Sequence, residues 1–131
     1  GSSMTAGLTE EWVNSIAEFS SILPSKKFSI TLQYEISGAT EGKVRYYVIF
    51  EEGKVTEAKI GKHSSPDCLI CTTFGELISI LERNKAVTVS FIQGNLKVEG
   101  EYERYLLEMS SIRSTQEWGS MLKALREELS P

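Results

Sequence analysis

Hydrophobic and polar residues alternate with different periods along the chain, and each change of period predicts a new element. The first apolar positions recur every three or four residues, which is the spacing of one helix face. They are Trp12, Ile16, Phe19 and Leu23. Thr9 is suited to cap the start of this helix, and Pro24 cannot continue it. We therefore predict a first helix between Thr9 and Pro24.

Two stretches with a period of two follow, as expected for strands. Residues 28–36 place apolar side chains on one face and polar ones on the other, so this strand should have one solvated face. The polar positions are Ser29, Thr31, Gln33 and Glu35. After a turn at 38–42, residues 44–50 alternate again. Tyr47 and Ile49 make the second face of this strand apolar too, which predicts a central strand covered on both sides.

Two further strands complete the first part of the sheet. Residues 51–54 form a predicted tight hairpin into a strand over 55–60. A loop over 61–66 then leads to a strand over 68–72.

A helix and an ambiguous segment come next. Thr73 and Glu76 have the spacing of a capping box, which opens a helix with a buried stripe. The stripe is Phe74, Leu77, Ile78 and Leu81. Residues 86–93 alternate like a strand, yet Gly94 stands where a helix C-cap would be.

The last third of the chain predicts one strand and two helices. Residues 96–98 form the strand, and apolar positions mark a helix over 102–112. They are Tyr102, Tyr105, Leu106, Met109 and Ile112. A second capping box, from Ser114 to Glu117, opens a helix over 114–129. Its apolar stripe is Trp118, Met121, Leu122, Leu125 and Leu129.

This order of elements predicts an α+β fold. The hairpins imply a five-stranded, mostly antiparallel sheet, and helices with one apolar face must cover it. The chain of 131 residues is the size of one domain. Residues 4–131 form this domain, whereas 1–3 are interpreted as a remnant of cloning.

Charge and composition exclude several classes of function. The net charge is −4, with acidic and basic residues interspersed. The sequence has no basic stripe of the kind that would predict nucleic-acid binding. The apolar runs are too short for an integral membrane segment, and no signal peptide follows Met4. We therefore expect a cytoplasmic protein.

Neither metal nor redox chemistry is expected. Cys68 and Cys71 have a C-x-x-C spacing, but His63 is the only histidine to add to a zinc site. Residues three apart in a strand face opposite sides, so the two thiols should diverge and act as small apolar side chains. His63 is interpreted as a solvated loop residue. Catalytic and phosphate-binding motifs are lacking as well, so we predict no enzyme activity and no cofactor.

The closing strand carries a family resemblance. Gly94-Asn95-Leu96-Lys97-Val98-Glu99-Gly100 follows an Asp-led strand at 67–72, a Phe74-x-x-Leu77 helix, and Phe91 and Gln93. From Asp67 to Ile112 this pattern resembles the sterol carrier protein type 2 family, and the upstream elements agree in order. On this resemblance, 86–93 is a short helix.

The resemblance implies a non-catalytic carrier. Members bind sterols, fatty acids or fatty acyl-CoA in an apolar tunnel between sheet and helices. The implied ligand-binding residues are Phe74, Leu77, Ile78, Leu81, Phe91, Ile92, Gln93, Tyr105, Leu106, Met109, Trp118, Met121, Leu122 and Leu125. Gln93, Tyr105 and Arg104 are candidates to orient the polar head of a lipid-like ligand.

The helix over 114–129 departs from the family pattern. It could close the tunnel, fill it, or form a homodimer with its copy in another subunit. The bulky segment Glu101-Tyr102-Glu103-Arg104 could narrow the cavity. A non-catalytic assembly module with a filled core is therefore the alternative function.

Overall fold

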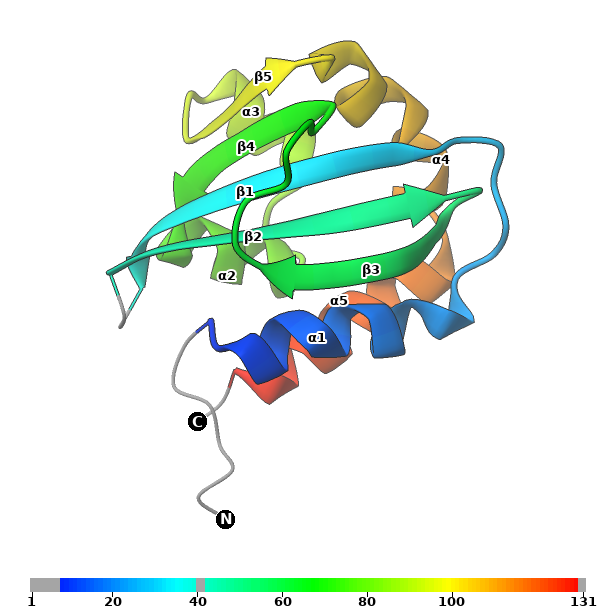
Figure 1. The fold of residues 1–131 in the computed structure, drawn as a ribbon, viewed down its shortest axis with the longest axis horizontal. Coiled ribbons are helices and arrows are strands. Elements are labelled where there is room, and N and C mark those ends of the chain that lie inside the picture. The colour runs from blue at the N-terminus through cyan, green and yellow to red at the C-terminus, as the bar shows by residue number, and fades with distance from the viewer. Residues whose placement is uncertain (1–7, 40–41, 130–131) are drawn as a thin grey trace.

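The computed structural model describes residues 8–39 and 42–129. Its described strands form one sheet in the order β3-β2-β1-β4-β5 (Figure 1). They are β1 (Ile30–Ala39), β2 (Gly42–Glu51), β3 (Lys54–Ile60), β4 (Cys68–Thr73) and β5 (Leu96–Gly100). β1 pairs in parallel with β4, and the other neighbours are antiparallel. The predicted five-stranded, mostly antiparallel sheet is confirmed.

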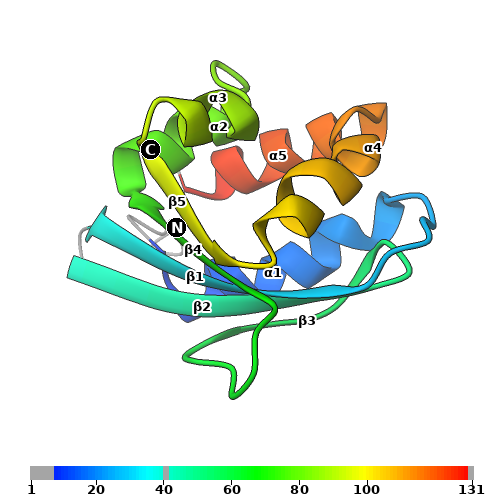
Figure 2. The same cartoon turned by 90° about the horizontal axis from the view of Figure 1, so that it is seen from above.

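The helices gather on one side of this sheet, which we call its inner face. They are α1 (Glu10–Phe19), η1 (Ser20–Ile22), α2 (Phe74–Leu81), α3 (Val87–Ile92), η2 (Arg104–Glu108), α4 (Ser110–Arg113) and α5 (Gln116–Glu128). Figure 2 shows α2, α3, α4 and α5 on this side, and α1 packs along β3. The α+β class is confirmed. No helix in the described ranges is long and apolar enough to cross a bilayer.

Threonine caps begin three helices. The Oγ1 atoms of Thr9 and Thr73 accept hydrogen bonds from backbone N–H groups three residues later, as predicted. The last helix is capped by Thr115 and not by Ser114, which corrects the predicted capping box. The backbone of Ser114 is already helical, whereas Thr115 is extended with ψ at 155°. An N-cap needs that extended backbone.

The ambiguous segment 86–93 contains a helix, α3, as the family resemblance implied. Its local alternation of β-branched residues does not produce a strand. The fully buried Ser90 explains part of this outcome, because its Oγ donates to the Glu76 carboxylate of α2. Tertiary contacts thus override the local propensity of the segment.

The predicted continuous helix over 102–112 is wrong in detail. η2 is a π-helix, in which the Met109 N–H donates to the Arg104 carbonyl five residues earlier. Tyr105 and Leu106 are buried as predicted, but Tyr102 is 48% exposed. A π turn inserts an extra residue into a helix and is frequent at functional sites.

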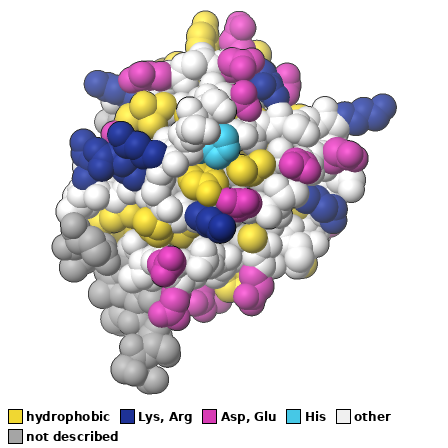
Figure 3. Space-filling model, viewed as in Figure 1, with side chains coloured by type: hydrophobic (Ala, Val, Ile, Leu, Met, Phe, Trp, Pro, Cys, Tyr) yellow, Lys and Arg dark blue, Asp and Glu magenta, His cyan; other side chains and the backbone are white. Residues whose placement is uncertain are grey.

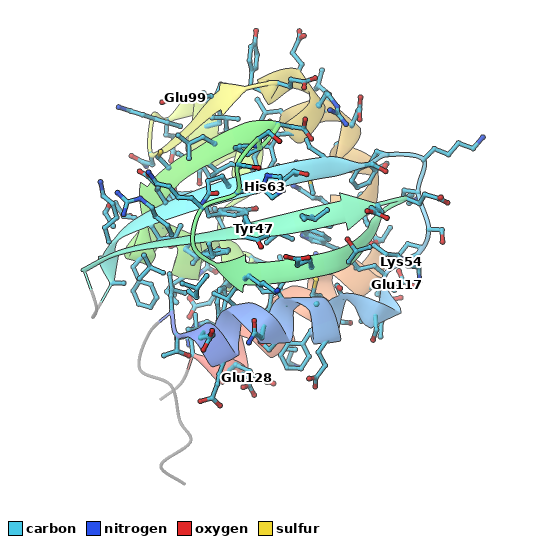
Figure 4. All side chains as sticks on the ribbon, viewed as in Figure 1. Tyr47, Lys54, His63, Glu99, Glu117 and Glu128 are labelled. Atoms are coloured by element: carbon cyan, nitrogen blue, oxygen red, sulfur yellow. The ribbon has the colours of Figure 1, made fainter. Side chains whose placement is uncertain are left out.

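The outer face of the sheet is partly covered by the connection between β3 and β4. The Gln33 side chain is buried beneath it: Nε2 donates to the Gly61 carbonyl at 2.9 Å, and Oε1 accepts from His63 N–H at 2.7 Å. The ring of His63 meets Tyr47 edge-on (Figure 4). Figure 3 shows His63 in the middle of this face, beside hydrophobic side chains.

Two predictions about the strands need correction here. The polar face of β1 is not fully solvated, because Gln33 is a buried anchor for the connection. β2 lies inside the sheet, but Tyr47 and Ile49 on its outer face are only half-buried, since a loop and not a layer of helices covers them. The predicted remnant at 1–3 and residues 40–41 of the predicted turn lie outside the described ranges.

Cys68 and Cys71 lie on opposite faces of β4, as predicted. Cys68 is buried with its Sγ 3.1 Å from the Glu101 carbonyl, and Cys71 faces Glu35 on the neighbouring strand. Burial raises the pKa of both thiols, and at Cys71 the Glu35 carboxylate raises it further. Both features oppose formation of the reactive thiolate.

We predict that the native protein keeps two slowly reacting free thiols. A colorimetric thiol reagent should modify Cys71 before Cys68, and both should react faster after denaturation. The order can be read by mass spectrometry of peptides. A native disulfide between the two cysteines would contradict the strand geometry.

Glu76 joins α2 to α3. Its carboxylate accepts hydrogen bonds from Lys85 Nζ at 2.8 Å and from Ser90 Oγ, and these contacts lower the pKa of Glu76 below 4.5. We expect Glu76→Gln to cost about 1–2 kcal/mol of unfolding free energy at neutral pH. The folded-state pKa is depressed, so this stabilisation is present above about pH 4.5 and is lost as pH falls through the folded-state value.

Urea denaturation at several pH values tests this prediction. Glu82→Gln is the matched control, because it removes an exposed ion pair with Arg126 and should cost under about 1 kcal/mol. An equal cost for both variants at neutral pH would show that Glu76 is not a special anchor.

Candidate functional site

A cavity of about 90 Å³ lies between the inner face of the sheet and the helices. The strands contribute Tyr34, Tyr46, Val48, Phe50, Val55, Ile70, Thr72 and Leu96 to its wall. The helices and the residues between them contribute Trp12, Ile16, Leu77, Ile80, Leu81, Val87, Tyr105, Met109, Arg113, Trp118, Met121, Leu122 and Leu125. The wall is predominantly apolar, as is usual for a site that holds a hydrophobic ligand.

The structure brings eight of the fourteen proposed ligand-binding residues into this wall. They are Leu77, Leu81, Tyr105, Met109, Trp118, Met121, Leu122 and Leu125. Leu106 belongs to the hydrophobic core without lining the cavity, and the partly buried Phe74, Ile78 and Phe91 pack against that core. Ile92 and Gln93 end α3 and face solvent, with Ile92 81% exposed. The short α3 turns only its first residue, Val87, toward the cavity.

Arg104 does not lie at the cavity, although it was a candidate to orient a polar head. Its guanidinium makes ion pairs with Asp67 at 3.8 Å and with Glu101 and Glu108, and it donates to the Ser29 carbonyl. Arg104 therefore ties η2 to the ends of β1 and β4. Of the three candidates for the polar head, only Tyr105 lines the cavity.

Two tyrosines of the wall were missed at the level of sequence. Tyr34 and Tyr46 are register partners in β1 and β2, and their rings stack with centroids 4.8 Å apart. Tyr105 is close enough to Tyr34 to add to the effect of burial in raising the pKa of the Tyr34 hydroxyl. Their positions in the two alternating strands were a usable signal, because both fall on the apolar face that must meet the helices.

Burial shapes the chemistry of these hydroxyls. Tyr34 keeps part of its surface toward the cavity, but its hydroxyl is removed from bulk water, and this burial raises its pKa well above 10. Burial raises the pKa of Tyr46 in the same direction. The cavity therefore presents neutral hydroxyl groups, which can hydrogen-bond to a ligand and are poor general bases at neutral pH.

α5 closes the cavity from the helix side. Its side chains Met121 and Leu125 are buried in the wall. The indole Nε1 of Trp12 in α1 donates to the Leu125 carbonyl at 2.9 Å, so the first and last helices are joined directly. The last helix thus serves as a cover, which is one of the three arrangements its apolar stripe allowed.

The described residues offer few groups for catalysis around this cavity. His63 lies on the outer face of the sheet, and no three His, Cys, Asp or Glu side chains of the described ranges gather as metal ligands do. The polar groups in the wall are tyrosine and threonine hydroxyls and the Arg113 guanidinium. This set is suited to binding and orienting a ligand.

The profile of the SCP-2 sterol transfer family matches residues 24–107, more than half of the chain. The protein therefore belongs to this family, and the resemblance seen in the sequence is confirmed. A comparison with curated protein sequences finds no match.

Solved structures support the same fold at low sequence identity. A conserved hypothetical protein from Thermus thermophilus is 15% identical with a TM-score of 0.71, covering 97% of this chain and 96% of that one. Sterol carrier protein 2 is 14% identical with a TM-score of 0.67, covering 91% and 96%. Palmitated SCP2L2 from Aedes aegypti is 17% identical with a TM-score of 0.60, covering 78% and 88%.

The buried tyrosines generate a test by titration. Of the five tyrosines, we expect Tyr34 and Tyr46 to form phenolates only when the protein unfolds in alkali. Because burial raises their folded-state pKa values, the folded protein holds both tyrosines in the neutral form. The free energy of unfolding therefore falls as pH rises beyond about 10, where an unfolded tyrosine ionises. Ultraviolet absorbance of phenolate, followed beside circular dichroism, measures both events.

A double variant, Tyr34→Phe with Tyr46→Phe, should lack the late absorbance step that accompanies unfolding. Tyr102→Phe is the control, because that side chain is half exposed and lies outside the cavity. Ionisation of all tyrosines before any loss of structure would contradict the burial of the two hydroxyls.

Proposed function

We propose that this protein is a non-catalytic carrier for one hydrophobic, lipid-like ligand held in the cavity between sheet and helices. The observation that carries the proposal is an apolar cavity covered by α5 in a member of the SCP-2 sterol transfer family. One structural relative, SCP2L2 from Aedes aegypti, was determined in a palmitated form. A fatty acid, a fatty acyl-CoA and a sterol- or isoprenoid-like molecule are the candidate ligands.

Burial of the ligand's hydrocarbon would supply the binding energy. Each methylene group moved from water into the cavity contributes about 0.8 kcal/mol. Burial raises the pKa of Tyr34 and Tyr46 and keeps both hydroxyls neutral, so an alkyl chain beside them meets no charged group.

The cavity must widen to admit a long chain. Its volume of about 90 Å³ is below the roughly 300 Å³ at the lower end of typical ligand pockets. The cavity in this conformation is therefore smaller than the lipid-binding tunnel that the family resemblance implies. Met109 and Met121 are the adaptable side chains in the wall, because unbranched thioethers change rotamer at low cost.

The small cavity is also the observation that favours the alternative function, an assembly module with a filled core. In that case the wall residues would serve stability alone. The apolar stripe of α5 argues for the carrier over a homodimer through this helix, because Met121, Leu125 and Leu129 are already buried within one subunit. Ligand binding separates the carrier from the assembly module.

Val48 and Ile49 provide a matched pair for this test. They are neighbours in β2, and Val48 lines the cavity while Ile49 faces the outer side. Val48→Phe should fill much of the cavity with an aromatic ring. A bound chain would then overpack the same space, at a cost of about 1–3 kcal/mol, so binding of a fluorescent long-chain fatty acid should weaken at least about tenfold. Ile49→Phe should bind the probe like the unmodified protein.

The unmodified protein should show a saturable rise in probe fluorescence that unlabelled lipid reverses. Circular dichroism and thermal unfolding establish that both variants are folded. A folded protein that binds no probe, fatty acid, acyl-CoA or sterol would refute the carrier and leave the assembly module.

A further inference from the structure

A second cavity of about 240 Å³ adjoins the first. It is enclosed by the end of α2, the connection from 82 to 86, the start of α3, the end of α4 and α5. Its wall consists of Ile80, Arg83, Lys85, Ala86, Val87, Arg113, Trp118 and Leu122. Five of these residues also line the first cavity, namely Ile80, Val87, Arg113, Trp118 and Leu122. The two cavities therefore share one partition, and we call the second one the vestibule.

The charge of the vestibule is of one sign. Three of its eight lining residues are cations and none is acidic, although the chain as a whole has a net charge of −4. Lys85 is already paired with Glu76 at 2.8 Å. Arg83 and Arg113 form no ion pair with a carboxylate in the described ranges, and nearby Glu82 pairs instead with Arg126. Two positive charges thus remain uncompensated beside an apolar cavity.

The structure holds both arginines in place. Arg113 lies 4.5 Å above the centre of the Tyr105 ring, and one of its nitrogens is 3.8 Å from the sulfur of Met109. Arg83 has a left-handed backbone with φ at 61°, and its guanidinium rests on Gly119 of α5, where any Cβ would overlap it. The missing side chain at Gly119 leaves the space beside α5 that the Arg83 guanidinium occupies.

From this arrangement we infer that the vestibule binds the anionic head group of a single-chain amphiphile whose alkyl chain enters the apolar cavity through the shared partition. The inference rests on the proposed carrier function and deepens it by assigning the ligand class. A carboxylate or a phosphate would meet Arg113 and Arg83, whose forked N–H donors match two oxygens of either group.

Arg113 occupies the decisive position, because it lines both cavities. Its stacking on Tyr105 fixes the guanidinium at the boundary between polar and apolar space. A neutral sterol would leave both arginines without a counter-ion. An anionic amphiphile supplies the counter-ion for both arginines when its alkyl chain is buried. Trp118 and Leu122, which line both cavities, would pack against that chain.

Competition experiments can test this inference. A neutral fluorescent alkyl probe is displaced by palmitate, hexadecyl phosphate, hexadecanol or cholesterol. We expect at least one of the two anions to bind about tenfold more tightly than hexadecanol, the effect of one charge-assisted hydrogen bond. The order of palmitate and hexadecyl phosphate identifies the head group that is preferred.

Variants then locate the preference. Arg83→Gln with Arg113→Gln should remove the preference, so that the anions bind this variant no better than hexadecanol binds the same variant. Arg113→Lys should retain part of the preference, because it preserves the charge. Arg126→Gln, in α5 but outside both cavities, is the control and should retain all of it.

The outcomes separate the inference from the proposed function. Equal binding of anions and hexadecanol by the unmodified protein would overturn the inference and leave the carrier intact. A preference that survives in the double glutamine variant would overturn it too. Failure of every ligand, hexadecanol and cholesterol included, would refute the carrier itself.

Discussion

The parallel pairing of β1 with β4 is the constraint on which the rest of the structure depends. Parallel neighbours cannot be joined by a hairpin, so the chain must make a crossover between them. Here the crossover is the β2–β3 hairpin followed by a connection that runs over the outer face (Figure 1). Because that face is taken by the connection and its Gln33 anchor, the helices gather on the inner face. The cavity lies where their apolar sides do not fill the space against the sheet.

Periodicity in the sequence predicted the strands and eight residues of the cavity wall. Leu77, Leu81, Met121 and Leu125 repeat at helical spacing, so their common direction could be predicted before any contact was known. The missed features depend on residues distant in sequence. In the sequence Gln33 falls on the polar face of its strand, and the loop residue Gly61 that covers it lies 28 residues further on. Arg113 ends α4, which follows a π-helix that no local pattern indicates. Ile92 and Gln93 were misplaced because α3 is too short to aim both ends inward.

The wall of the cavity combines rigid and adaptable parts. Its floor is the stacked pair of Tyr34 and Tyr46, which belong to hydrogen-bonded strands. Trp12 of α1 meets the ring of Tyr46 edge-on, with the ring centroids 5.9 Å apart. Its roof consists largely of methionine, leucine and tryptophan side chains that the helices turn toward the sheet. A ligand would therefore shift the roof and leave the floor in place, since strand pairing resists displacement more than side-chain packing does.

The hydrogen bond from Trp12 to the Leu125 carbonyl has a consequence for biosynthesis. The two helices that it joins come from opposite ends of the chain, and the ribosome delivers α5 only after every strand has emerged. Until that moment the inner face of the nascent sheet lacks the part of its cover that α5 supplies over Val48, Phe50 and Ile70. The interval between synthesis of the strands and synthesis of α5 is thus both a period of aggregation risk and a time at which a hydrophobic guest could be enclosed without any later opening.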